Sequence, residues 1–157
     1  MTDLEILTEK LFAAWLAAKA KPCKLLRDCR VTPALSDGKY TYPALIVSAD
    51  TATELAPCAN VFELPLTVVV ASIPKDDAAS VDTHRRRVAR VRALLLGVDS
   101  DLAEAQAAAV CAELNTLALG VTVSGYTPVL GGGATARADN HIADSLALTV
   151  TVSLGNS

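Results

Sequence analysis

The amino-acid sequence predicts an α/β fold of the α+β kind, in which a mixed, mainly antiparallel sheet has its helices packed on one face. Apolar residues occupy every second position of residues 62–70, which is typical of a strand with one buried face. Residues 80–96 carry apolar side chains at spacings of three and four, the stripe of an amphipathic helix. Residues 145–154 alternate again. Two long strands and a helix laid over them would form the core of such a fold.

The chain begins with a predicted helix that ends before Pro22. Thr2 and Glu5 have the spacing of a capping box, in which each side chain bonds the backbone of the other residue. Lys19 and Lys21 suit the negative end of the helix, and proline cannot continue it. A broad apolar face runs between these ends, made by Leu4, Leu7, Leu11, Phe12, Trp15 and Leu16.

The remaining elements follow from alternation and turn residues. Short strands are predicted over residues 29–32 and 40–48, and a polar connection over 49–59 leads to the long strand at 60–73. After the helix at 80–96 come a third helix over 101–115, a strand over 119–126, a long loop over 131–144 and the closing strand. Because short turns join antiparallel pairs and a helix between strands supplies a crossover, the sheet should be mixed.

Composition indicates one domain, residues 1–157, that associates with other copies. The hydrophobic share is 52% while aromatic residues make up only 4%, and surplus apolar surface in a small domain favours burial against other subunits. The net charge of −3 argues against a nucleic-acid-binding face. Acidic Asp3 and Glu5 stand where a signal peptide would be positive. Glycines and a proline interrupt the longest uncharged run, 114–136, so no membrane span is expected.

The sequence predicts no catalytic residue, no cofactor and no metal. His84 lies on the apolar stripe, and no nucleophile with an orienting group can be named beside it, so a core or interface histidine is favoured. Asp76 and Asp77 precede a helix, where carboxylates suit the positive end. Asp139 and His141 lack a third ligand. The cysteines, predicted to be reduced thiols, match no zinc or redox spacing; they are Cys23, Cys29, Cys58 and Cys111.

Two stretches are candidate subunit or partner interfaces. Helical geometry places Arg86, Arg87 and Arg90 away from the apolar stripe, with Arg85 and Arg92 flanking it. They form either a solvated face balanced by nearby aspartates or a surface that pairs with carboxylates of a partner subunit, since guanidinium groups suit bidentate contact. The second stretch is not followed by a Lys-Ser/Thr pair, so it is a hairpin tip rather than a phosphate loop; it comprises Gly131, Gly132 and Gly133.

The order of elements resembles the tail terminator (tail completion) proteins of long-tailed bacteriophages. The resemblance rests on the amino-terminal helix, the Tyr-Pro-Ala and apolar run at 42–47, the long strand ending at 72–77, the helix at 80–96 and the strands at 121–126 and 145–154. It implies an α/β subunit of a ring, usually of six copies, that caps the tail tube, ends its polymerisation and faces the head-side connector. The implied partners are the tail tube protein and the connector, with no membrane and no sequence-specific nucleic acid.

Such a protein would be assembled in the host cytoplasm and reside in the virion tail. The family has no catalytic residues to carry over. A neck or head–tail connector protein of the same particle is the alternative, because it would share much of this layout. A tail tube subunit would be richer in strands and lack two central helices, and a small cytoplasmic enzyme using His84 belongs to a different class.

Overall fold

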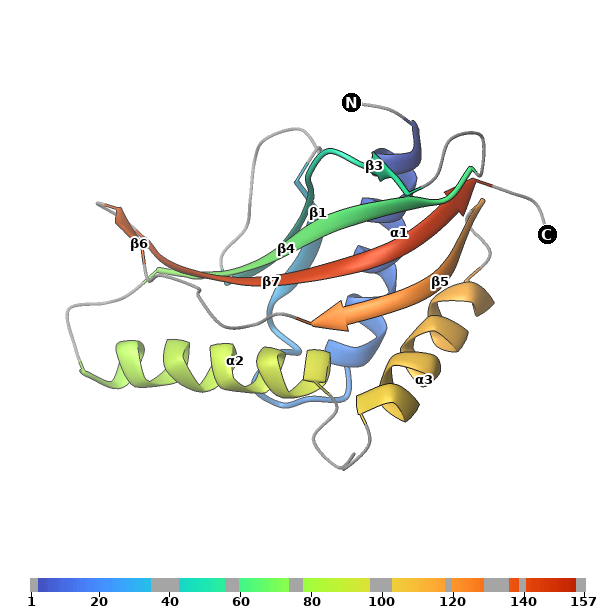
Figure 1. The fold of residues 1–157 in the computed structure, drawn as a ribbon. Helices are drawn as coiled ribbons and strands as arrows, with labels where there is room; N and C mark the ends of the chain where they lie inside the picture. Colours follow the sequence, from blue (N-terminus) through green and yellow to red (C-terminus); the bar gives the residue numbers. More distant parts are fainter. Residues whose placement is uncertain are drawn as a thin grey trace.

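The computed structural model describes residues 3–34, 43–55, 60–73, 78–96, 103–117, 120–128, 136–138 and 141–154. Within these residues the chain forms three helices and a seven-stranded sheet, an α+β fold as predicted (Figure 1). The helices are α1 (Asp3–Ala20), α2 (Ala78–Leu96) and α3 (Ala103–Thr116). The strands are β1 (Arg30–Pro33), β2 (Ala44–Ala49), β3 (Thr53–Glu54), β4 (Phe62–Ser72), β5 (Val121–Pro128), β6 (Ala136–Ala138) and β7 (His141–Leu154).

The two longest strands form the centre of the sheet. The main order is β1-β2-β4-β7-β5, with β3 added to β4 and β6 added to β7. β4 and β7 pair antiparallel from Phe62↔Val152 to Ser72↔Ile142, and β2 and β5 pair antiparallel on either side of them. β1 and β2 are parallel, which the rule of antiparallel neighbours did not predict. The two strands are separated by residues 34–43, more than a two-residue hairpin turn contains.

The helices all pack on one face of the sheet, as the sequence predicted (Figure 1). Alternation directs every second side chain of the central strands to this face, where they are buried: Leu64, Leu66, Val68 and Val70 from β4, and Leu146, Leu148, Val150 and Val152 from β7. Opposite them, α1 contributes Leu11, Phe12, Trp15 and Leu16. Each such side chain removed from water stabilises the fold by about 1.5–3 kcal/mol before entropy is counted.

Buried carboxylates of α1 fix the start of this helix to the end of β2. Glu9 Oε2 accepts a hydrogen bond from the Ala49 amide at 2.8 Å, and Glu5 Oε1 accepts one from the Ala52 amide at 2.8 Å. Both side chains are almost fully buried. The capping box predicted that the Glu5 side chain bonds the backbone at the start of the helix, whereas Glu5 Oε1 accepts from another segment, at Ala52. Thr2, the other residue of the capping box, lies outside the described residues.

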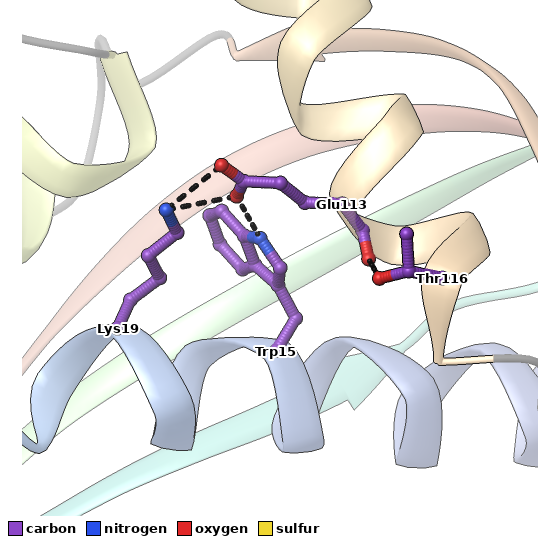
Figure 2. A network of polar contacts seen from close by, with 4 residues as sticks. All are labelled: Trp15, Lys19, Glu113 and Thr116. Carbon is purple, nitrogen blue, oxygen red and sulfur yellow. Dashed lines mark hydrogen bonds and ion pairs between the residues drawn. The ribbon is translucent and has the colours of Figure 1, made fainter.

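A second carboxylate joins α1 to α3. Figure 2 shows Glu113 of α3 accepting hydrogen bonds from Trp15 Nε1 and Lys19 Nζ, each at 2.9 Å. Burial by itself raises the pKa of Glu113, but the bonds from Lys19 and Trp15 outweigh it, so the pKa of this carboxyl lies below its usual value. The indole of Trp15 is thereby satisfied while its ring packs 5.0 Å from Phe12.

The stretch expected to be a loop at 131–144 contains strand structure at its end. Residues of β6 pair with the first residues of β7, from Ala136↔Ala143 to Ala138↔His141. The closing strand therefore begins at His141 rather than at Ser145, which places Asp144 inside the sheet. Pairing with the full length of β4 extends β7 through these polar residues. The predicted hairpin tip, Gly131, Gly132 and Gly133, lies outside the described residues.

Candidate interaction surface and a buried histidine network

Three of the predicted interface arginines lie on the solvent side of α2. Arg85, Arg86 and Arg90 are exposed. Arg86 Nε is 2.9 Å from Asp82 Oδ2, an ion pair one helical turn apart on the surface that contributes little to stability. In the described part of the chain, neither Arg85 nor Arg90 has a carboxylate partner. This face of α2 therefore exposes three guanidinium groups, one of them paired with Asp82.

Arg87 differs from the prediction because it turns toward the body of the protein. Its side chain is half-buried, and Nε donates to the Leu25 carbonyl at 3.3 Å. Nη1 donates to Ser72 Oγ at 3.4 Å. Position 87 lies three residues after His84 and four before Val91, so it borders the buried stripe rather than opposing it. Arg87 therefore connects α2 to β4 and to the segment after α1, rather than projecting away from the buried stripe as predicted.

A shallow groove lies between α2 and the segment after α1. Among the described residues, the groove is lined by Leu25, Arg86, Ala89, Arg90 and Ala93 and has a volume of ≈ 380 Å³. Alanines on successive turns of the helix leave room that larger side chains would fill. An apolar floor is therefore combined with two guanidinium groups, a combination suited to an apolar side chain accompanied by carboxylates.

On the opposite side of α2, His84 joins three elements in a buried polar network. Its Nδ1 lies 2.8 Å from Ser72 Oγ on β4, and its Nε2 lies 2.7 Å from Asp144 Oδ2 on β7. A carboxylate can only accept, so Nε2 carries a proton. In the neutral tautomer Nδ1 accepts from the Ser72 hydroxyl, whose oxygen accepts from Arg87. The imidazole is 2% exposed, as expected for a core histidine.

In many hydrolases a serine, a histidine and an aspartate act as nucleophile, base and orienting acid. Here Ser72 is only 4% exposed, and a nucleophile must be reached by a substrate carbonyl. The Ser72 oxygen also accepts from a guanidinium, which does not favour its attack on another group. This geometry supports a structural bond between strands and helix more than a reaction centre.

Sequence reasoning did not find the partners of His84. Ser72 continues the inward alternation of Leu64 to Val70, and Asp144 continues that of Leu146 to Val152. Extending both alternations by one step would have placed a hydroxyl and a carboxylate on the helix-covered face. The missing information was the length of the closing strand, because Asp144 reads as a loop residue.

The cysteines described by the structure are free thiols, at positions 23, 29 and 111. Burial raises the pKa of Cys29 and that of Cys111, so both thiols are poor nucleophiles at neutral pH. Cys58 lies outside the described residues, as do Asp76, Asp77 and Asp139. None of the helices, in the ranges described, is long and apolar enough to cross a membrane.

Comparison with known proteins gives no functional name. No protein-family model and no curated protein matches the chain. A solved structure whose name describes no function aligns with 99% of this chain and 100% of its own length, at 14% sequence identity and a TM-score of 0.49. A likeness at this level carries no argument about function.

Proposed function

We propose that this chain is a structural subunit of a phage or prophage tail, a tail terminator. Copies would form a ring of six that caps the tail tube, ends its polymerisation and joins it to the head-side connector. The proposal rests on the order of elements, which resembles that family, and on one observation in the structure. That observation is the exposed basic face of α2 beside an apolar groove, a surface suited to a protein partner.

The proposed surroundings follow from the same role. The protein would be assembled in the host cytoplasm and reside in the virion tail, with the tube protein and the connector as partners. Arg85, Arg86 and Arg90 are the interface residues that we retain, because their side chains are exposed. No membrane and no sequence-specific nucleic acid would be required. The net charge of −3 supports contact with protein rather than with phosphates.

Imaging of particles made without this protein tests the role. If the chain ends tube polymerisation, its absence should give tails longer than normal, whether or not they join heads. A neck or head–tail connector protein, the alternative within the same particle, would instead leave tails of normal length beside full heads. That second result would reject the terminator role and keep the structural one.

An enzyme is the candidate from another class, favoured by the contact of His84 with Ser72 and Asp144. A serine hydrolase with these residues would react with a fluorophosphonate probe at Ser72, and Ser72→Ala would abolish the labelling. We expect no labelling of the folded protein, because Ser72 is buried. Stoichiometric labelling at Ser72 would reject the purely structural assignment.

A further inference from the structure

A second surface, next to β3, carries negative charge, whereas arginines line the groove on α2. Leu55 follows β3 directly, and its side chain is 51% exposed, so its apolar surface can be reached by a partner. Its amide donates to the Val61 carbonyl at 2.9 Å, and Thr53 pairs with Glu63 of β4. The leucine is therefore held by hydrogen bonds to the strand beside it, β4, and the residue before that strand.

One acidic residue lies on the same face of the strand pair as this leucine. Successive residues of a strand point to opposite faces, so Thr53 and Leu55 share a face and Glu54 points to the other. Glu63 lies across the ladder from Thr53, on the face of Leu55, and is exposed. We call this surface, Leu55 with Glu63, the acidic knob.

The acidic knob and the groove are complementary in chemistry. Leu55 would contact the apolar floor at Leu25, Ala89 and Ala93, while the Glu63 carboxylate would meet the exposed guanidinium groups of Arg86 and Arg90. Opposite charges around an apolar contact favour both its rate of formation and its orientation.

Within one subunit the two surfaces cannot meet, because α1 separates them. The first turn of α1 is bonded to Ala52, next to β3, whereas the last turn leads to the segment that contains Leu25. A helix of 18 residues is about 27 Å long. Figure 1 likewise shows β3 and α2 on opposite sides of the molecule. The acidic knob can fill this groove only in another copy.

We infer that the acidic knob of one copy of this chain docks in the α2 groove of the next. Two different surfaces then meet at every contact, which makes the contact head-to-tail. Repeated head-to-tail contacts close into a ring or extend as a filament. The inference rests on the proposed ring and names the contact that would build it.

Mixing two complementary variants tests this contact. Leu55→Asp disables the acidic knob and leaves the groove, while Ala89→Glu places a carboxylate in the groove and leaves the acidic knob. Each variant alone should remain a single chain by light scattering. Mixed in equal amounts, they share one intact contact per pair, so the expected product has twice the chain mass and does not grow further.

Matched controls separate this effect from general damage. Leu117→Asp changes another exposed leucine, and Ala108→Glu changes an exposed alanine of α3. Both controls should assemble like the unaltered protein. Exchanging the charges tests the ion pair across the contact. Arg90→Glu and Glu63→Arg should each weaken assembly by about tenfold or more, and a chain carrying both substitutions should regain most of the lost assembly.

Several results would overturn the inference. If the unaltered protein assembles and neither Leu55→Asp nor Ala89→Glu reduces its mass, the contact lies elsewhere while the ring stands. If the mixture of variants forms no pairs, the contact is not head-to-tail between these surfaces. If the unaltered protein stays a single chain, both the contact and self-assembly fail, and imaging of particles then decides the terminator role separately.

Discussion

At the scale of single residues, His84 connects β4, α2 and β7 through two short contacts, 2.8 Å to Ser72 and 2.7 Å to Asp144. His84→Ala removes both and leaves a buried hydroxyl and a largely buried carboxylate without this partner. We expect the free energy of unfolding to fall by about 3 kcal/mol, since unsatisfied buried polar groups are costly. Urea unfolding of the two proteins measures this change in the free energy of unfolding. Arg85→Ala, on the exposed side of the helix, should change stability by less than about 0.5 kcal/mol; a similarly small effect of His84→Ala would contradict the structural role.

Glu113 gives a pH-dependent prediction at the same scale. Its folded-state pKa is lowered, so its contribution to stability is fully present above the ordinary value of 4.5 and is lost as the pH falls through the folded-state value. Glu113→Gln should destabilise by about 0.5–1 kcal/mol at pH 7, because the site is partly exposed to water.

Urea unfolding of both proteins at pH 7 and pH 3 measures this difference, which should be smaller at the acidic pH. Asp28→Asn, which removes an exposed carboxylate, serves as the control with no expected loss. An equal loss at both pH values would show that the carboxylate charge is irrelevant to the bond between α1 and α3.

At the scale of elements, Tyr126 attaches β5 to the end of α2. Its buried hydroxyl donates to the Leu95 carbonyl at 2.6 Å, one of the last carbonyls of the helix, which lack partners within it. Burial raises the pKa of Tyr126 above its ordinary value of 10.0, so the hydroxyl stays protonated at neutral pH and can donate this bond.

Tyr126→Phe keeps the ring packed and removes only this bond. We expect a loss of about 1–2 kcal/mol and faster amide hydrogen exchange in the last turn of α2. Ser124→Ala on the same strand, whose hydroxyl makes an exposed contact of 3.4 Å, should change neither. Unchanged exchange in α2 would mean that the hydroxyl does not hold the helix end.

Elements with a regular pattern could be predicted from sequence, and those defined by their pairing could not. Alternating leucine and valine identified β4 and most of β7, and the stripe through His84 identified α2. β3 has two residues and β6 three, so neither shows a period; each exists because a longer strand lies beside it. Arg87 was misplaced for a related reason, because a side chain at the border of a stripe turns toward whatever partner the tertiary fold supplies.

At the scale of the whole molecule, the sequence specifies a sheet with all its described helices on one face, since the buried alternation of β4 and β7 selects that face. The parallel pairing of β1 and β2 is a contact between separate segments, which local patterns do not encode. The groove on α2 depends likewise on how closely the segment with Leu25 approaches the helix. Its arginines were visible in the sequence, but its apolar floor was not.

The central claim is that copies of this chain assemble with one another through surfaces that a single subunit leaves exposed. Light scattering of the purified protein over a range of concentrations tests it directly. We predict a mass that rises to a fixed multiple of the chain mass, six for the proposed ring, and then stays constant. A mass equal to one chain at the highest concentration would contradict the account.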